Sequence, residues 1–334
     1  YGAGWPELNN FDFKINVRNN DVKLQSIQGD ILSNNIVKMV GNISPFNTED
    51  PIMNIDLILD SPIPTIINAI NKSPIKLVMK GFFDGMKGDG PGQLAVKLNI
   101  PLKDEDNITF KGSYEFMNSY LINNDLGMPK IKNILGYLMF DENDLSITDA
   151  TANLSGSPIS IGLNNIGTMT QVNIDGVVNQ EFILSTLGKN WSSRMGGKAD
   201  WSGEIKLGDM ATSIKIESNL KGLELKLPPP FNKEENDITT LLITSESINL
   251  NQKMISLELG TYASIKLIKE NNYAGVYGIK SGLININTVQ TEIPDEGVLL
   301  SAELNKVNLE LFNSLFNNLN SKPLITNANI NIQE

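Results

Sequence analysis

The sequence predicts an all-β protein with a few short amphipathic helices, built as a long antiparallel meander that curls into an elongated, groove-forming sheet. Three observations support this prediction. Apolar and polar residues alternate through most of the chain. Turn-forming residues separate the alternating runs at intervals of roughly 8–14 positions, and only a few segments have helical spacing.

The strand pattern is clearest between residues 94 and 102, where every second residue is apolar. Successive side chains of a strand point to opposite faces, so one face of this strand is apolar. The pattern recurs often enough to predict on the order of 20–24 strands. The clearest other runs are 15–17, 53–59, 159–163, 172–174, 214–216, 223–227, 255–259, 263–267 and 328–332.

Three segments, 62–72, 181–195 and 311–319, place apolar residues three and four positions apart and predict short amphipathic helices. Their spacing of about 120–130 residues indicates a repeat of one helix followed by about eight strands. We therefore expect residues 1–334 to form a single elongated β-groove segment. Its possible repeat units are 1–60, 61–180, 181–310 and 311–334. Because the chain begins with Tyr1 rather than Met, we expect it to be part of a longer protein.

The composition excludes several classes of function. The chain has no His and no Cys, which removes Ser-His-Asp and Cys-His catalysis, histidine-based zinc sites and disulfides. We expect no enzyme activity and no cofactor. The formal net charge of −11 argues against a nucleic-acid partner and against an anionic membrane surface, because both require a concentrated basic surface.

Two kinds of loop could suggest ligand sites. The glycine-rich segment 85–92 lacks the Lys-Ser/Thr ending and the flanking strand and helix of a phosphate-binding loop. The acidic segments 103–106 and 141–144 lack the central Gly and terminal Glu of an EF-hand calcium loop. We interpret the glycine-rich segment as a flexible hairpin connection and the two acidic segments as solvated turns, and we predict no metal site.

Alternation requires that something cover the apolar face of the sheet. A second sheet would do so in a tandem β-sandwich, which would fit an extracellular or periplasmic scaffold or adhesin. However, the chain is only 7% aromatic, and the alternating positions are mostly Ile, Leu and Val. No Pro/Ser/Thr-rich linker marks a boundary between two sandwiches. An open trough lined by aliphatic side chains fits these features at least as well.

Several segments resemble a known family. Residues 218–233 read S-N-L-K-G-L-E-L-K-L-P-P-P-F-N-K and resemble the S-x-L-x-G-L-x-x-x-L-P-x-P-x-x-K element of the YhdP-type proteins of the AsmA superfamily. Residues 92–102, 134–140 and 197–201 are similar to further elements, in the family's order. The resemblance covers about residues 50–315. One departure is Leu311-Phe312, where the family tends to have Trp.

The resemblance implies a bridge-like lipid transport protein of the AsmA-like and TamB-like kind in diderm bacteria. Such a protein is anchored in the inner membrane by a segment outside this chain and extends through the periplasm. It moves phospholipid toward the outer membrane, so the implied partners are phospholipid acyl chains and the two membranes. Within the family element, the resemblance marks Gly222, Pro228, Pro230 and Lys233 as motif residues and so as candidate site residues.

The alternating positions supply the predicted lining of the lipid groove. These residues share an apolar side chain on the side of the strand that is expected to face the groove. They are Leu94, Val96, Leu98, Ile100, Ile159, Ile161, Leu163, Ile214, Ile216, Leu223, Leu225, Leu227, Ile255, Leu257, Leu259, Ile265 and Leu267.

Scattering in solution tests the trough against a compact fold. About 20–24 strands spaced by roughly 4.8 Å predict a radius of gyration near 30 Å, whereas a compact globule of this length predicts about 20 Å. A measured value near 20 Å would contradict the trough.

Overall fold

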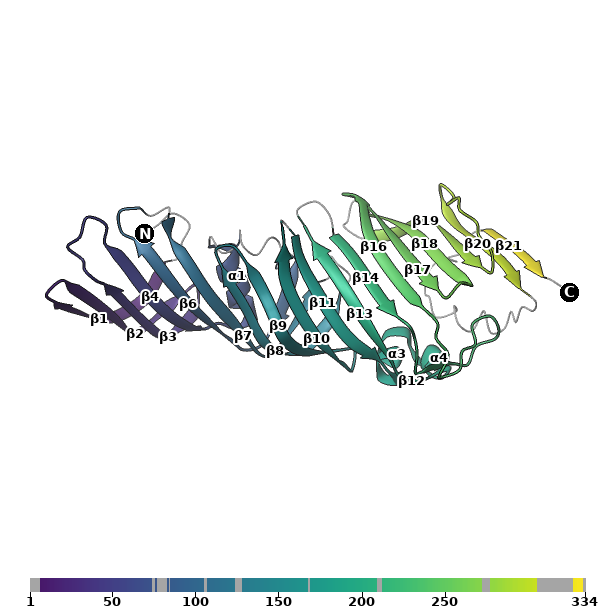
Figure 1. Ribbon diagram of the computed structural model, residues 1–334, viewed down its shortest axis with the longest axis horizontal. Helices are drawn as coiled ribbons and strands as arrows, with labels where there is room; N and C mark the ends of the chain where they lie inside the picture. The colour runs from purple at the N-terminus through teal and green to yellow at the C-terminus, as the bar shows by residue number, and fades with distance from the viewer. Residues whose placement is uncertain are drawn as a thin grey trace. The chain divides into compact units, whose positions relative to one another are not determined.

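The computed structural model describes residues 7–73, 76, 83, 85–104, 107–123, 128–167, 169–208, 212–271, 277–304 and 327–332. In these ranges most regular structure is β-strand (Figure 1). Nineteen strands belong to one mixed sheet, and two short strands form a separate ladder. The predicted all-β class with a few short helices is confirmed.

The chain divides into two compact units. Unit 1 comprises Tyr1–Leu154 and Ser160–Val172, and unit 2 comprises Ser155–Ile159 and Asn173–Glu334. The division falls within strands β10 (Ser157–Ile166) and β11 (Met169–Val178). The repeat units expected from the sequence stay a prediction.

Unit 1 is an antiparallel meander in which most strands pair with their neighbours in the chain. Strand β4 pairs with β6, because a helix and the short β5 intervene in the sequence. The long β7 pairs with β6 along its first half and with β5 along its second. The strands are β1 (Leu8–Arg18), β2 (Asp21–Ile31), β3 (Asn34–Ile43), β4 (Ile52–Asp60), β5 (Met86–Asp89), β6 (Gly92–Pro101), β7 (Thr109–Asn123), β8 (Met128–Asp141) and β9 (Leu145–Leu154).

Helix α1 (Ile63–Asn71) confirms the first predicted helix and buries Ile63, Ile66 and Ile70 on one face. Its start is fixed to the sheet by backbone bonds from Ser61 N to Gly92 O (2.9 Å) and from Ile63 N to Gly90 O (3.1 Å). The buried Tyr114 hydroxyl of β7 also donates to Ser61 O at 2.7 Å. The helix therefore joins the core of unit 1 through both apolar packing and hydrogen bonds.

The apolar face of unit 1 is filled by large side chains. Register aligns Leu59 of β4, Leu94 of β6, Tyr114 of β7 and Leu138 of β8 in one row, and all four are buried. Aromatic rings from β7 and β8 pack against one another on the same face. Burial falls toward β1, where Phe13, Ile15 and Val17 are 44%, 56% and 62% exposed.

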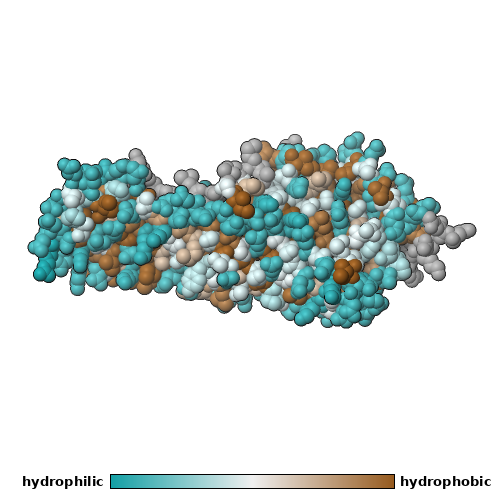
Figure 2. Space-filling model, viewed as in Figure 1, coloured by the Kyte–Doolittle hydropathy of each residue, from teal (hydrophilic) through white to brown (hydrophobic). Residues whose placement is uncertain are grey.

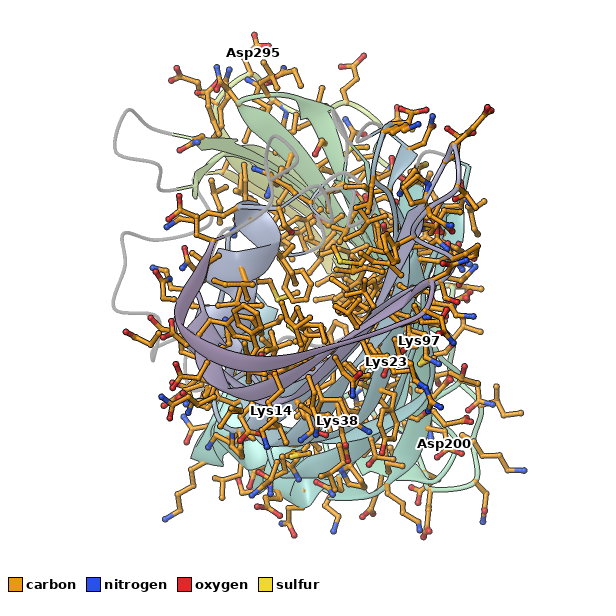
Figure 3. The ribbon with its side chains drawn as sticks, turned by 90° about the vertical axis from the view of Figure 1, so that its left-hand side faces the viewer. Lys14, Lys23, Lys38, Lys97, Asp200 and Asp295 are labelled. Carbon is orange, nitrogen blue, oxygen red and sulfur yellow. The ribbon has the colours of Figure 1, made fainter. Side chains whose placement is uncertain are left out.

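The opposite face of unit 1 is polar. In Figure 3 the strands are seen as a curve, and the labelled Lys14, Lys23, Lys38 and Lys97 lie on its convex side. Lys97 forms an exposed ion pair with Asp56 at 3.6 Å. The face turned to the viewer in Figure 2 is mostly hydrophilic, with apolar residues in small separate groups. The alternation in the sequence is thus realised as one apolar and one polar face.

Unit 2 combines an antiparallel sheet with parallel strands near its C-terminal end. Strands β13, β14, β16, β17, β18 and β19 pair in that order and are antiparallel. Strand β20 then pairs in parallel with both β19 and β21. The sheet strands are β13 (Ala199–Leu207), β14 (Thr212–Ser218), β16 (Leu241–Asn249), β17 (Gln252–Leu259), β18 (Ala263–Asn271), β19 (Tyr277–Ile286), β20 (Gly297–Leu304) and β21 (Asn327–Ile332). The meander is therefore mixed rather than wholly antiparallel.

The second predicted helix is observed as two short helices, α3 (Gln180–Leu187) and α4 (Lys189–Ser192). Gly188, with a φ of 86°, separates them in a conformation that favours glycine. Asn179 begins α3 by accepting a bond from Phe182 N at 2.9 Å. The third predicted helix, 311–319, lies outside the described residues. No helix in the described ranges is long and apolar enough to cross a membrane.

Replacing Tyr114 with Phe tests the attachment of α1. Loss of the buried donor to Ser61 O should lower the free energy of unfolding by about 1–2 kcal/mol at pH 7. Burial raises the pKa of the Tyr114 phenol, so the wild type should lose stability as the pH rises above the ordinary value near 10. Because Phe cannot ionise, the difference in the free energy of unfolding between the wild type and the variant should become smaller at high pH. Urea titrations followed by circular dichroism measure both effects. A difference in unfolding free energy that does not change with pH would contradict the raised pKa of Tyr114.

Candidate functional site

The candidate site is an apolar surface on the sheet of unit 2, here named the open face. Register places Ile216 of β14, Ile243 of β16, Leu257 of β17, Ile265 of β18 and Ile284 of β19 in one continuous row. Flanking rows on the same face are also mainly aliphatic. The open face comprises Ile205, Ile214, Ile216, Leu241, Ile243, Ile255, Leu257, Leu259, Ala263, Ile265, Leu267 and Ile284.

The open face differs from the filled face of unit 1 in its burial. Every residue of the open face is half-buried rather than buried, although each lies within a paired strand. Leu94 of unit 1 has the same alternating environment in the sequence but is only 7% exposed. In unit 1, α1 and the rings of Phe110, Tyr114 and Phe140 fill the space above the strands. The residues that define the open face are all aliphatic, and each of them stays half-buried.

The structure brings together part of the predicted groove lining. Ile214, Ile216, Ile255, Leu257, Leu259, Ile265 and Leu267 all lie on the open face. The remaining predicted lining residues lie elsewhere. In unit 1, Leu94, Val96 and Leu163 are buried, and Leu98, Ile100 and Ile161 are half-buried. Ile159 is buried and belongs to unit 2.

Leu223 and Leu225 are placed outside the large sheet. They form β15 (Leu223–Leu225), which pairs only with β12 (Met195–Gly197) among the described strands. Their side chains are 1% and 6% exposed in a cluster with Ile183, Ala199 and Leu220. Leu241 and Leu259 of the open face pack against this cluster, so it closes one end of the open face. Leu223 and Leu225 thus lie in the buried cluster that borders the open face and are not part of the open face itself.

The family element forms a loop over residues 219–240, here named the motif loop. Its two ends are joined by a bond from Thr239 N to Asn219 O at 3.0 Å. Gly222 has a φ of 91°, donates to Glu235 O at 2.7 Å and accepts from Lys198 N at 2.9 Å. A Cβ atom at Gly222 would lie 2.4 Å from Lys198 O. Only glycine fits this position, because both the conformation and the close backbone approach exclude a side chain.

Lys233 is a buried lysine at the centre of the motif loop, with 3% exposure. Its Nζ donates to Leu223 O at 2.7 Å and to Glu234 O at 3.0 Å. Its backbone exchanges bonds with Leu225 in both directions. Desolvation lowers the pKa of Lys233, and the charges of Asp237 and Glu235 oppose that shift. The ammonium group therefore acts as an internal clamp on the loop.

The proline-rich part of the motif loop carries Phe231 to the sheet. Phe231 N donates to Pro228 O at 2.9 Å, which closes a turn around Pro230. The ring then packs edge-on against Tyr262, with centroids 5.9 Å apart, and against the cluster of Ile286, Leu300, Ala302 and Leu304. Pro228 and Pro230 are half-buried, as is Leu227. The motif loop thus packs against the sheet in two places. Leu223 and Leu225 belong to the cluster that contacts β16 and β17, and Phe231 packs against residues of β19 and β20.

Comparison with known proteins gives one finding at the level of the family. The family model described as "YhdP protein" matches residues 1–334. The chain belongs to the YhdP family. No curated protein and no solved structure matches it significantly. The resemblance drawn from the sequence motifs is confirmed.

Some residues of the site in this YhdP-family chain were not predicted from the sequence. Leu241 and Ile243 were missed because Leu241-Leu242-Ile243 is a continuous apolar run that does not show which face is buried. Ile284 was missed because Leu283 beside it is also apolar. The pairing of Ile243 with Leu257 and of Ile284 with Ile265 shows that these residues belong to the open face. In the described part of the chain, no group of three or more acidic residues is placed to hold a metal ion.

The role of Lys233 in this YhdP-family loop can be tested by Lys233→Met. The variant keeps most of the side-chain volume but leaves the buried Leu223 carbonyl and the partly buried Glu234 carbonyl without their donor, which should cost about 2–4 kcal/mol. Urea unfolding followed by tryptophan fluorescence measures the loss, because Trp191 packs against the buried cluster beneath the loop. The exposed Lys226, paired with Glu224 at 3.1 Å, provides the control: Lys226→Met should change stability by less than about 1 kcal/mol. Equal effects of the two substitutions would contradict the clamp.

Proposed function

We propose that this chain carries lipids by shielding their acyl chains on the open face. In the cell, it would serve AsmA-like phospholipid transport between the inner and outer membranes. It would act in the periplasm as part of a protein anchored in the inner membrane. The observation that carries the proposal is the continuous aliphatic row from Ile216 to Ile284, which is half-buried although it lies at the centre of a paired sheet.

The energetics of lipid transfer explain why such a surface would be useful. Exposing an acyl chain of about 16 carbons to water costs on the order of 13 kcal/mol, at roughly 0.8 kcal/mol per CH₂ group. An accessible aliphatic surface lowers that barrier by burial alone. The proposal needs no catalytic group, metal or bound nucleotide, and we propose that the chain is not an enzyme.

The composition of the open face favours movement over tight binding. Ile and Leu side chains present similar apolar contacts from one strand to the next. An acyl chain on such a surface therefore meets few positions that hold it much more strongly than their neighbours. The large rings of unit 1 would instead occupy the space that an acyl chain needs.

Lipid analysis of the chain purified without detergent tests the proposal. We expect native mass spectrometry and organic extraction to find bound phospholipid. Protein without any lipid would contradict the proposal and favour the scaffold interpretation, in which the surface binds no lipid.

A substitution on the open face should separate lipid binding from folding. Leu257→Asp should reduce retained lipid strongly but lower stability by only about 1–2 kcal/mol, because the side chain is half-buried. The uncharged Leu257→Asn should act in the same direction. Ser256→Asp provides the matched control, since Ser256 precedes Leu257 and lies on the opposite face. The buried Leu94→Asp should instead cost about 3–5 kcal/mol or unfold unit 1. Unchanged lipid retention in a folded Leu257→Asp protein would contradict the proposal.

A further inference from the structure

The turn between β5 and β6 contains an Asp-Gly pair in which the aspartate side chain is folded back onto the backbone. Asp89 is the last residue of β5, and Gly90 follows it outside both strands. Gly90 N donates to Asp89 Oδ1 at 2.8 Å. The Cγ atom of Asp89 is bonded directly to that oxygen, so the carboxyl group lies against the nitrogen of the next residue. Asp89 is exposed, and water therefore reaches this carboxyl group.

This contact joins the two groups that react when a succinimide forms. Gly90 N attacks Cγ of the Asp89 carboxylic acid, and a new N–Cγ bond closes the ring. The Cγ–OH bond breaks, and the hydroxyl group leaves with the amide proton as water. A second water molecule then opens the ring at either of its carbonyl carbons. Opening at the main-chain carbonyl leaves the backbone running through Cγ as an isoaspartyl linkage, so the reaction needs nothing but water.

The fold keeps a glycine at the attacking position. Gly90 has a φ of 118°, a conformation that favours glycine. A Cβ atom at this residue would lie 2.6 Å from Ser119 Cα, so the space also excludes a side chain. The absence of a side chain leaves the approach to the nitrogen unhindered. Because reacting groups that are held together react faster than free ones, the turn favours ring closure.

Another Asp-Gly pair of the chain provides an internal comparison. The sequence contains three such pairs and no Asn-Gly pair. Asp84 of the first pair lies outside the described residues. Asp175 and Gly176 lie within β11, where side chains stand out of the sheet and the amide groups lie in it. A Cβ atom at Gly176 would be 2.8 Å from Ile159 and 2.9 Å from Trp201, so neighbouring strands cover this glycine.

The backbone at Asp89 and Gly90 also holds the start of helix α1. Gly90 O accepts from Ile63 N at 3.1 Å, an N–H group that has no partner within its own helix. On the other side, Asp89 pairs with Tyr120 in the ladder between β5 and β7. An isoaspartyl linkage lengthens the main chain between these two contacts by one carbon atom. Both contacts cannot then be kept, and the first turn of α1 loses its acceptor.

We propose that the Asp89–Gly90 pair is a site of spontaneous isoaspartate formation, and that this modification detaches the first turn of α1 from the sheet. The inference goes beyond the proposed function and does not rest on it. It depends only on the geometry of one turn in unit 1 and on water.

Storage of the whole 334-residue chain at physiological temperature and neutral pH tests the site. Trypsin cleaves after Lys87 and Lys97, so Asp89 falls on a peptide, residues 88–97, that contains one Asp and no Asn. Electron-transfer fragmentation of the peptides identifies isoaspartate at each position. We expect it to accumulate roughly tenfold faster at Asp89 than at Asp175. Equal or slower accumulation at Asp89 would overturn the proposal.

Matched asparagine variants separate the effect of the fold from that of the dipeptide. Asp89→Asn and Asp175→Asn close the same ring with loss of ammonia, and the later hydrolysis raises the mass of the chain. We expect Asp89→Asn to react roughly tenfold faster in the folded chain, and the two variants to react at similar rates in urea. Circular dichroism verifies that both are folded. Equal rates in the folded chain, or a difference that persists in urea, would overturn the role of the turn.

Hydrogen exchange tests the detachment of α1. Stored wild type is compared with stored Asp89→Glu, whose longer side chain does not form the succinimide but which undergoes all other damage of storage. In molecules that carry isoaspartate at position 89, the Ile63 amide should exchange roughly fivefold faster, as expected when one hydrogen bond is lost. Unchanged exchange at Ile63 in those molecules would overturn the detachment. Isoaspartate at position 89 that is absent from the stored wild type would overturn the site itself.

Discussion

Cross-strand register is the constraint on which the rest of this structure depends. A shift of one residue between two strands would move every aliphatic side chain of one strand to the polar face. The pairing of Ile243 with Leu257, and of Leu257 with Ile265, keeps the apolar row continuous across β16, β17 and β18. The same register puts the carboxylates of these strands on one side. The aliphatic row on one face and the carboxylates on the opposite face therefore both follow from a single set of backbone hydrogen bonds.

What packs above a strand then decides whether its apolar face becomes core or accessible surface. Leu94 and Leu257 both belong to runs of alternating residues, and nothing in those runs distinguishes them. Leu94 is buried within unit 1, whose core includes α1 and a group of aromatic rings, whereas Leu257 is half-buried on a face built mainly from aliphatic residues. The sequence could predict the strands and the apolar side of each strand. It could not predict this difference, because the covering groups come from elsewhere in the chain.

Other elements show the same limit of local patterns. The segment 181–195 has helical spacing, but Gly188 divides it into two helices. Residues 223–227 alternate like a sheet strand, yet Leu223 and Leu225 pair with β12 and support a buried cluster. The motif around Gly222 and Lys233 was found from its residues, whereas the clamp made by Lys233 Nζ became evident only from its contacts. Parallel pairing of β20 could not be predicted, because it depends on partners rather than on alternation.

The two kinds of strand pairing also have a consequence for how the chain folds. Strands β16, β17 and β18 join through tight hairpins, so each can pair with its neighbour as soon as both have been synthesised. The parallel pairing of β20 with β19 and β21 requires the chain to return across the sheet before each new ladder begins. Contacts between residues close in sequence form quickly, and those that need a crossover form slowly. The part of the aliphatic row on β16, β17 and β18 should therefore assemble hairpin by hairpin, and the docking of β20 and β21 should be the slow step that completes unit 2.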